Sequence, residues 1–474
     1  MDRQIGFACT TIFHYIHFKR IASLFKNQAR FIIATPKYTN NRHEKLTAFF
    51  EENRIAYCES DDLISGKVQV DAIVAPYFLP LFHFIDPAIP RIRVLYGYAK
   101  DAWNYADWNR GFDLALVYGP YSFERLRSMA PTVEIGHPRY LGPHVPVHSD
   151  VTGIDGRKLS EWLAGPDRKT VLFCPTWGGL SSFEWFRRSL DGLLADYRVI
   201  VKLHHGISLS NEYHYNDLSD DHIFLCDETA DLFNLFPVSD LVISDYSGAI
   251  FDAMLAEKRL LLINSIPSEV KDTGVYNINK MSNIGKLGKA DVTESLDIQA
   301  RRWLPTVGEP GAVAAKVKEL LEQPAMDYRD MNRQLYAYQD SRAPERAHAA
   351  ISELLASGAR KRQVDHPGRF RTDQFRAFVE TFKDSPFVVW GAGDYGQLIV
   401  SWLKHAGIQV ASVLDMKKEK HGKLLHGVPI ASPETVAFGP DDKLIISFPE
   451  DRDELAARLR SMGMKDGNWI MPID

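Results

Sequence analysis

Two short apolar runs that each end in polar residues constrain the fold of this chain more than any other feature. Residues 199–203 and 241–244 consist largely of β-branched and other apolar side chains, as buried parallel strands do. Residues 247–257 follow the second run and place apolar side chains on one face of a helix. The order strand, turn and helix predicts a doubly wound α/β sheet.

Polar residues follow both predicted strands at the edge where a doubly wound sheet binds its ligand. Lys202 and His204 come at the end of the first strand, and Asp245, Ser247 and Gly248 follow the second. The free N–H groups at the start of the next helix favour an anion. This stretch therefore predicts a phosphate-binding crevice with a lysine and a histidine on its rim.

The size and composition describe an ordinary globular chain. Its 474 residues exceed one hydrophobic core and predict two to four domains. The net charge of −5 argues against bulk nucleic-acid binding. Four cysteines without metal-ligand spacing predict buried free thiols in a reducing compartment. No signal peptide or apolar run of about 18 residues is present, so we expect a cytoplasmic protein.

Alternating strand and helix signals divide the chain into three predicted domains. We expect a Rossmann-like domain over residues 1–150 and a second one over 168–358 that ends in helices. A third, small Rossmann-like domain is expected over 373–474. Stretches rich in proline, glycine and charged residues, at 142–168 and 359–372, predict the connections.

Two segments leave open a peripheral contact with the inner face of the cell membrane. Residues 75–87 are apolar and aromatic, so they predict either a loop packed in the core or a membrane contact. Residues 359–372 are basic and predict either a solvated linker or a contact with anionic lipid. The core loop and the solvated linker are the preferred interpretations.

The third predicted domain contains a glycine motif. Gly391, Gly393 and Gly396 form G-x-G-x-x-G between a predicted strand and a predicted helix. Asp415 ends the next predicted strand, where an acidic residue can bind a ribose. The motif indicates either a bound nucleotide or nucleotide-sugar, or a docking domain that uses the glycine turn for backbone geometry. No hydride-handling residues accompany it, which argues against an oxidoreductase.

Four motifs occur in a fixed order along the middle of the chain: CPTWGG (174–179), VKLHH (201–205), SDLVISDYSGAIFDAML (239–255) and DSRAPERA (340–347). This series resembles the CDP-glycerol glycerophosphotransferase family, of the teichoic-acid polymerase and primase type. The resemblance implies a glycosyltransferase-B-like pair of Rossmann-like domains. The third domain resembles the sugar-nucleotide-binding domains appended to some polysaccharide enzymes.

The resemblance implies transfer of glycerol phosphate, or a related polyol phosphate, from a CDP-linked donor. A hydroxyl of a surface-polysaccharide, capsule or teichoic-acid-like acceptor, itself a polysaccharide or lipid-linked, would attack phosphorus and release CMP. Such chemistry depends mainly on positioning and charge stabilisation. No cofactor is required, although a Mg²⁺ ion carried by the donor diphosphate is compatible with the sequence. The sequence contains no metal-ligand cluster.

The resemblance also gives candidate roles to single residues. His204 would donate to the diphosphate or protonate the leaving CMP. Lys202 and Thr176 would contact phosphate, and Ser247 with Gly248 would form the anion-binding helix start. Asp245 would either bind the substrate or hold its loop. Asp252 would bind the ribose of the donor or support the helix start.

One position departs from the family pattern. The family has H-G-x-x-x-K in the N-terminal domain, whereas this chain reads YGYAK, with Tyr96 in place of the presumed basic histidine and Lys100 retained. An unperturbed tyrosine, with a pKa of about 10, is a poor base at neutral pH. His14 is the preferred substitute base, and Asp101 is a further candidate. Two alternatives stay open: a nucleotide-sugar glycosyltransferase of the same architecture, and a non-catalytic nucleotide-binding assembly protein.

Overall fold

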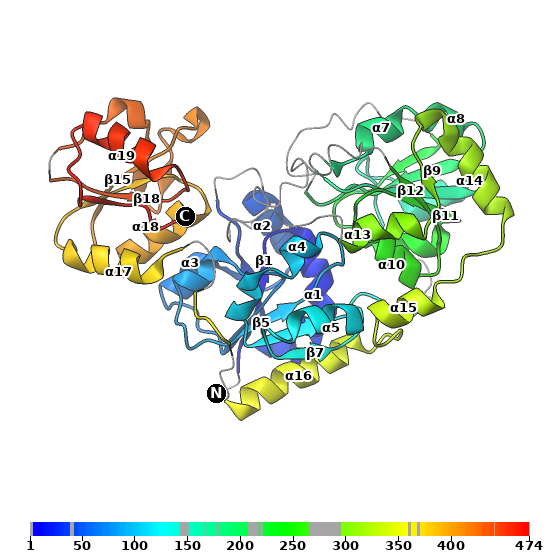
Figure 1. The fold of residues 1–474 in the computed structure, drawn as a ribbon, viewed down its shortest axis with the longest axis horizontal. Helices are drawn as coiled ribbons and strands as arrows, with labels where there is room; N and C mark the ends of the chain where they lie inside the picture. Colours follow the sequence, from blue (N-terminus) through cyan, green and yellow to red (C-terminus); the bar gives the residue numbers. More distant parts are fainter. Residues whose placement is uncertain are drawn as a thin grey trace.

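The computed structural model describes residues 3–37, 42–142, 151–165, 167–177, 180–206, 218, 221–264, 295–358, 362–366, 370–439 and 441–473. Within these residues the chain forms three β-sheets flanked by helices, arranged in a row with the N-terminal sheet in the middle (Figure 1). The predicted α/β class, with two large Rossmann-like domains and a small third one, is confirmed.

The first domain is built on a parallel sheet of seven strands in the order β3-β2-β1-β4-β5-β6-β7. Its strands are β1 (Ile5–Cys9), β2 (Ala29–Ile33), β3 (Tyr57–Glu59), β4 (Ala72–Ala75), β5 (Arg91–Val94), β6 (Leu114–Val117) and β7 (Thr132–Glu134). Its helices are α1 (Ile12–Phe25), α2 (Arg42–Glu52), α3 (Ser60–Ile64), α4 (Asp101–Asn104) and α5 (Pro120–Leu126). Every residue of β1, β4, β5 and β6 is buried, and all but Arg91 and Arg93 of β5 have apolar side chains or are glycine.

The second domain is built on a parallel sheet of six strands in the order β10-β9-β8-β11-β12-β13. Its strands are β8 (Thr170–Cys174), β9 (Arg198–Val201), β10 (Ile223–Leu225), β11 (Leu241–Ser244), β12 (Arg259–Ile263) and β13 (Thr306–Val307). Its helices are α6 (Leu159–Leu163), α7 (Phe183–Arg187), α8 (Leu190–Leu194), α9 (Leu232–Leu235), α10 (Ala249–Leu255), α13 (Leu296–Gln299) and α14 (Val313–Glu322). The central β8 and β11 pair in register from Val171 with Leu241 to Cys174 with Ser244, so their polar ends lie side by side.

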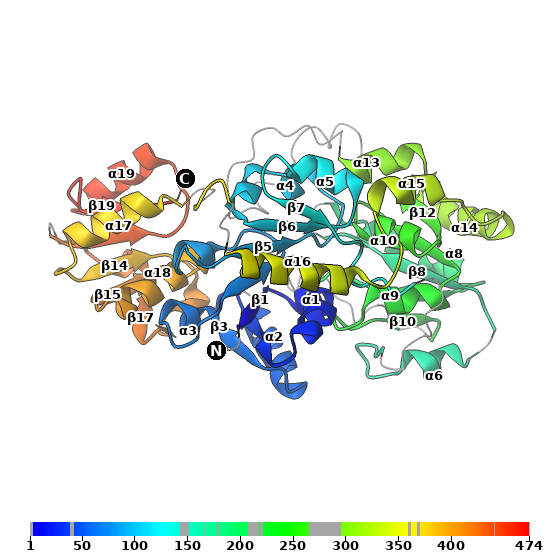
Figure 2. The ribbon, with the colours of Figure 1, turned by 90° about the horizontal axis from the view of Figure 1, so that it is seen from below.

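The helices after the second sheet return to the first domain. Helix α15 (Arg329–Leu335) contacts α5, and α16 (Ala343–Ser357) packs against α1. Ala347, Ile351 and Leu354 of α16 join the core of the first domain. Both views show α16 running along the first domain (Figures 1 and 2). The chain therefore crosses between the two large domains twice.

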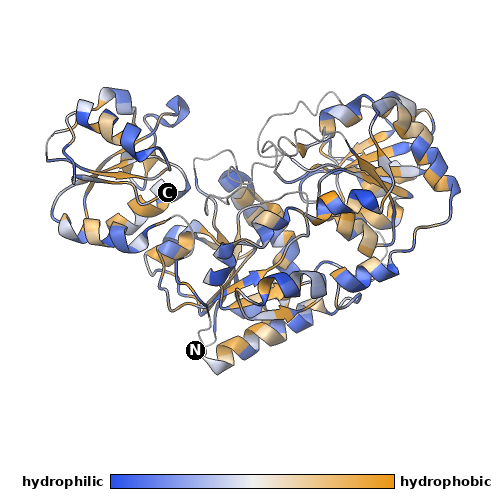
Figure 3. Ribbon diagram, in the orientation of Figure 1, coloured by the Kyte–Doolittle hydropathy of each residue, from blue (hydrophilic) through white to orange (hydrophobic). Residues whose placement is uncertain are grey.

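The third domain has a sheet in the order β16-β17-β15-β14-β18-β19, in which only the β16–β17 pair is antiparallel. Its strands are β14 (Phe387–Trp390), β15 (Val410–Leu414), β16 (Leu424–Leu425), β17 (Val428–Ala431), β18 (Lys443–Ile446) and β19 (Trp469–Ile470). Its helices are α17 (Thr372–Thr381), α18 (Asp394–His405) and α19 (Arg452–Ser461). Apolar residues gather on the sheets of all three domains (Figure 3).

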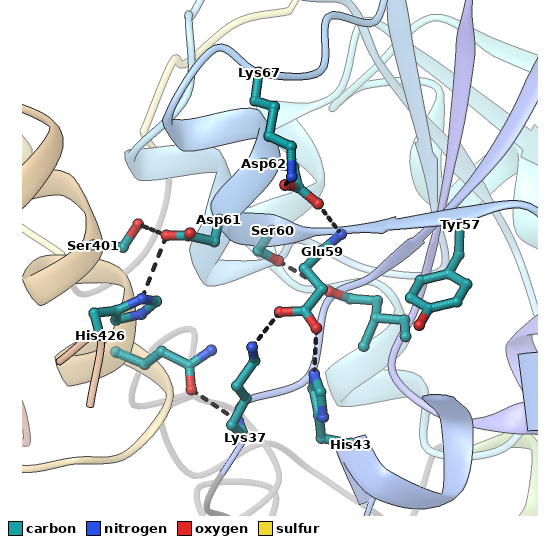
Figure 4. A network of polar contacts seen from close by, with 12 residues as sticks. Lys37, His43, Tyr57, Glu59, Ser60, Asp61, Asp62, Lys67, Ser401 and His426 are labelled. Carbon is teal, nitrogen blue, oxygen red and sulfur yellow. Dashed lines mark hydrogen bonds and ion pairs between the residues drawn. The ribbon is translucent and has the colours of Figure 1, made fainter. Parts of the chain in front are cut away.

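The third domain docks on the first through α18, which contacts α3 and the 3₁₀ helix η2 (Pro80–His83). The backbone N–H of Lys37 donates to Oε1 of Gln397 at 2.8 Å. Asp61 of α3 accepts a hydrogen bond from Ser401 and lies 3.6 Å from Nδ1 of His426 (Figure 4). Side chains of both domains thus build one polar interface.

Of the two segments with a membrane alternative, residues 75–87 are packed inside the protein, whereas residues 363–365 of the basic connection are exposed. In residues 75–87, the side chains of Phe78, Phe82 and Phe84 are almost fully buried. Arg362, in the described part of the basic connection, forms a buried ion pair with Asp113 at 2.9 Å. The structure therefore favours the core-loop interpretation for 75–87, while 359–361 and 367–369 lie outside the described residues. None of the described helices combines the length and apolar character that a membrane crossing requires.

Candidate active site

A cavity of about 320 Å³ lies between the two large domains. Its walls come from the loops after β1 and β5 of the first domain and after β8, β9 and β11 of the second. From the predicted site residues, His14 and Lys100 line it on the first side. Thr176, Lys202, His204, Ser247, Gly248 and Asp252 line it on the second. The strand-end imidazole and the start of α10 thus share one hollow.

His204 is held as a neutral hydrogen-bond donor. The backbone N–H of Gly206 donates to Nδ1 at 2.9 Å, so the ring proton resides on Nε2. The ring stacks on His205 at 4.2 Å between ring centres. Burial lowers the pKa of His204 well below its ordinary value, and Lys100 and Lys202 lower it further. A neutral imidazole with a fixed Nε2–H can donate to an oxyanion, whereas it is a weak proton donor.

Two lysines bring positive charge to the same place from opposite domains. Nζ of Lys100 lies 3.3 Å from Oγ1 of Thr176 and 5.7 Å from the ring centre of Trp177. Lys100 itself has a left-handed backbone, with φ of +66°, in the loop that faces the second domain. Nζ of Lys202 donates to the carbonyl of Leu203 at 3.3 Å. Neither lysine forms an ion pair with a carboxylate among the described residues.

Asp245 does not line the cavity, which argues against its predicted contact with substrate. Its Oδ1 accepts the backbone N–H of Thr176 at 2.7 Å, and its Oδ2 accepts the backbone N–H and hydroxyl of Ser182, both at 2.8 Å. The carboxylate is fully buried and occupied by these donors. Its role is the alternative one: it holds the loop after β8 against the loop after β11.

Asp252 lines the cavity, but its carboxylate is engaged by the first domain's connection to the second. Nη2 of Arg139 donates to Oδ2 at 2.6 Å, and Nε2 of His137 lies 3.2 Å from Oδ1. Nη1 of Arg139 also binds Asp231 at 2.8 Å. Burial acts to raise the pKa of Asp252, but Arg139 and His137 outweigh it and lower the pKa. The support role fits these contacts better than a ribose contact.

Asp101 does not line the cavity, which argues against its predicted role as a base. Its carboxylate accepts a hydrogen bond from the hydroxyl of Tyr121 and lies 3.5 Å from Nε of Arg125. Its backbone N–H donates to Ser295 at 3.2 Å. Burial raises the pKa of Asp101 to about 6. The residue fastens α4 to α5 and to the segment before α13.

His14 lines the cavity, but its hydrogen bonds argue against the prediction that it is the general base. The backbone N–H of Thr10 donates to Nδ1 at 3.2 Å, which leaves the ring proton on Nε2. Burial lowers the pKa of His14 to about 3. A base acting through Nε2 would need the proton on Nδ1, where it would meet the Thr10 donor. Burial also raises the pKa of the neighbouring Tyr96, so this phenol stays neutral.

The glycine turn of the third domain is stabilised from within the domain. Gly391 has φ of +111°, and a Cβ on Gly396 would overlap the carbonyl oxygen of Gly391. A Cβ on Gly393 would meet open space. Oδ2 of Asp415 accepts the backbone N–H of Ala392 at 2.8 Å and also binds Nζ of Lys420 at 2.8 Å. These contacts favour a structural role for Asp415, and its ribose contact stays a prediction.

Metal and thiol chemistry find little support in the described residues. No three His, Cys, Asp or Glu side chains in that part of the chain are grouped to hold a metal ion. All four cysteines are free and buried. The sequence analysis missed Arg139, which binds both Asp231 and Asp252 at the cavity wall.

Comparison with solved structures returns proteins of the two-domain glycosyltransferase kind. The wall teichoic acid polymerase TagF is 16% identical with a TM-score of 0.48, and the match covers 75% of this chain and 90% of TagF. The calicheamicin glycosyltransferase CalG4 is 13% identical with a TM-score of 0.43, and the match covers 75% of this chain and 98% of CalG4. UGT89C1 of Arabidopsis thaliana, complexed with UDP, is 11% identical with a TM-score of 0.42, and the match covers 75% of this chain and 99% of UGT89C1. No curated protein compared with the chain matches it significantly.

The family comparison selects the second domain and the loop that leads into it. The matched stretch begins before Arg139 and ends with β12, so it contains the Thr176 loop, His204 and the start of α10. The resemblance inferred from the sequence motifs is thereby confirmed. Residues 131–263 match the model of the CDP-Glycerol:Poly(glycerophosphate) glycerophosphotransferase family.

Proposed function

We propose that this protein transfers glycerol phosphate, or a related polyol phosphate, from a CDP-linked donor to a hydroxyl of a surface-polysaccharide acceptor. The observation that carries the proposal is the convergence of Lys100, Lys202 and the Nε2–H of His204 on one interdomain cavity. Two of these three residues lie within the stretch that matches the glycerophosphotransferase family. Positive charge and fixed donors in a partly enclosed cavity are what a diphosphate requires.

The donor would bind with its diphosphate between the two lysines. Lys100 comes from the first domain and Lys202 from the second, so a bound diphosphate would link the two domains. The hydroxyl of Thr176 and the backbone at Ser247 and Gly248 border the same space. A Cβ at Gly248, where the family usually has a second serine, would lie 3.8–3.9 Å from the backbone of residues 97–99, which is ordinary contact.

The reaction asks little of a general base. The acceptor oxygen forms a new bond to the phosphorus next to the polyol, the bond from that phosphorus to CMP breaks, and the hydroxyl proton passes to water. Such transfers proceed mainly through positioning and stabilisation of charge. A phosphate monoester has a second pKa of about 6, so CMP leaves as an anion and needs a donor more than a proton. The fixed Nε2–H of His204 suits that need.

The proposal extends to the surroundings of the reaction. The acceptor would be a capsule-like or teichoic-acid-like polymer, as a polysaccharide or a lipid-linked chain, and transfer would occur on the cytoplasmic side. Any Mg²⁺ would enter with the donor diphosphate, since the cavity carboxylates Asp231 and Asp252 already bind Arg139. Nucleotide binding by the glycine turn of residues 391–396 stays a prediction, and its occupied Asp415 favours the docking alternative.

The test is a panel of donors offered to the full-length protein. CDP-glycerol, CDP-ribitol and UDP-glucose are each incubated with protein and a bacterial surface-polymer acceptor, and released CMP and UDP are separated by chromatography. The proposal expects CMP from at least one CDP-polyol and no UDP. Release of UDP alone would establish the glycosyltransferase instead. Binding of CDP-glycerol without any release would establish the non-catalytic alternative.

A further inference from the structure

Three polar groups on the first-domain side of the cavity are buried without a partner. They are Oγ1 of Thr11, Nε2 of His14 and Nε of Arg42. Thr11 is 7% exposed and His14 is 1% exposed, and all three residues line the cavity. A buried polar group without a partner costs about 1–3 kcal/mol. Three of them at one place indicate that a ligand completes the site.

All three groups present donors. The Nδ1 of His14 accepts the backbone N–H of Thr10, so Nε2 carries a proton that no described residue accepts. The guanidinium of Arg42 can only donate, and the hydroxyl of Thr11 can donate as well. Arg42 lies near enough to His14 to lower the pKa of that imidazole. A ligand that meets these groups must therefore bring acceptors.

The backbone at this place adds to the same preference. Thr11 is the N-cap of α1, a helix of 14 residues, and its side chain makes no capping hydrogen bond. No acidic side chain lies in the first turn of α1. The free N–H groups and the positive end of the helix dipole are therefore not compensated by the helix itself.

The carboxylates on the cavity wall do not supply the missing negative charge. Asp231 and Asp252 both bind the guanidinium of Arg139. Glu228 lies 3.8 Å from Nζ of Lys45. The neighbouring Tyr77 hydroxyl lies 2.8 Å from Oγ1 of Thr10. Each of these carboxylates thus has a cationic neighbour among the described residues.

We infer that Thr11, His14 and Arg42 form a second anion subsite, which holds a phosphate group of the acceptor. The inference rests on the proposed function, because the first subsite, at Lys100, Lys202 and His204, is assigned to the donor diphosphate. Three donors from two elements, the start of α1 and the start of α2, suit a tetrahedral oxyanion, whose oxygens point in several directions, better than a planar carboxylate. The acceptor would thus be recognised by a phosphate near the hydroxyl that attacks.

The test is calorimetric titration of the full-length protein with inorganic phosphate. Arg42→Gln and Thr11→Val are each made in a Lys202→Met background, which weakens the donor side. We expect Arg42→Gln to lower the affinity for phosphate at least tenfold, and Thr11→Val to lower it at least threefold. Lys19→Gln, on the exposed face of α1, removes the same charge outside the cavity and should change nothing. Thermal unfolding of each variant controls for loss of the fold.

Two results would overturn the subsite. One is an unchanged phosphate affinity in folded Arg42→Gln and Thr11→Val, and the other is acetate binding as tightly as phosphate. The affinity for CDP-glycerol is measured in the same two variants with Lys202 restored, and it should stay within twofold of the wild-type value. If the wild type binds no CDP-glycerol but Arg42→Gln still lowers the affinity for phosphate, the donor proposal fails and the anion subsite stands.

Discussion

The carboxylate of Asp245 accepts the backbone N–H of Thr176 at 2.7 Å, which ties the loop after β11 to the loop after β8. Asn in place of Asp245 would turn an NH₂ group toward the donors of Thr176 or Ser182. We therefore expect Asp245→Asn to lower the free energy of unfolding by about 2 kcal/mol. Urea unfolding followed by circular dichroism measures this change.

Asp240→Asn is the matched control for that variant. Asp240 also accepts a backbone N–H, from Thr170 at 2.8 Å, but its side chain is 31% exposed and its ion-pair partner Lys169 is at the surface. We expect Asp240→Asn to cost about 1 kcal/mol or less. Equal losses in the two variants would show that the buried carboxylate does not hold the two loops as described.

Two substitutions in the glycine turn of the third domain test whether its backbone geometry requires glycine. Gly396→Ala should destabilise the third domain by about 3 kcal/mol, because its Cβ meets the carbonyl of Gly391 on fixed backbone. Gly393→Ala adds a Cβ in open space and should leave stability within about 0.5 kcal/mol. Thermal unfolding of the two variants makes the comparison. Equal stability of both would contradict the close packing at Gly396.

Gly248→Ser should be tolerated. Gly248 has φ of −61°, which any residue adopts, and its Cβ would make ordinary contacts with the loop at residues 97–99. The new hydroxyl would face the space assigned to the donor diphosphate. We expect an unchanged melting temperature and a donor affinity equal to or higher than that of the wild type, by calorimetry. A donor affinity tenfold lower would show that the loop at 97–99 needs this glycine.

Stability should fall as the pH falls below about 6.5. Burial lowers the pKa of several histidines in the folded protein, among them these six: His14, His17, His83, His137, His204 and His205. Below the unfolded value of 6.5, the unfolded chain binds protons that the folded protein refuses. Stability continues to fall as the pH approaches the pKa values of the histidines in the folded protein; for His14 this pKa is about 3. Each such histidine contributes up to about 1.4 kcal/mol per pH unit.

Asp101 has the opposite effect on the pH dependence of stability. Its folded pKa is raised to about 6, so the folded protein binds a proton before the unfolded chain does. One such group cannot offset six histidines. Urea unfolding at pH 7.5, 6.5 and 5.5 should therefore show decreasing stability. A constant free energy of unfolding over this range would contradict the neutral buried state of the histidines.

The sheets were predictable from the sequence because buried parallel strands are largely apolar, as at 199–203 and 241–244. The continuity of the helices was harder to predict from the sequence. Residues 183–194 form two short helices, α7 and α8, and between them the backbone N–H and the hydroxyl of Ser189 both donate to the carbonyl of Phe186, at 2.8 and 2.7 Å. A serine that competes in this way cannot be recognised from spacing alone.

The site was predictable in its cations and donors rather than in its carboxylates. Lys202 and His204 follow a strand, so the fold alone carries them to the ligand edge. Asp245, Asp101 and Asp415 also follow strands or turns, but each is occupied by donors that the chain supplies from elsewhere. Arg42 belongs to no motif, because only the folded structure brings α2 next to α1. Its absence from the sequence analysis reflects that long-range contact.

The most direct test of the account is the rate of CMP release from CDP-glycerol, with acceptor present, in His204→Ala. The account predicts a kcat about 100-fold below that of the wild type and a donor KM within a few fold, because one fixed donor to the leaving phosphate is lost. His348→Ala, on α16 against the ring of Phe25, should keep the wild-type rate. Equal kcat values for His204→Ala and the wild type would contradict the assignment of this cavity as the catalytic site.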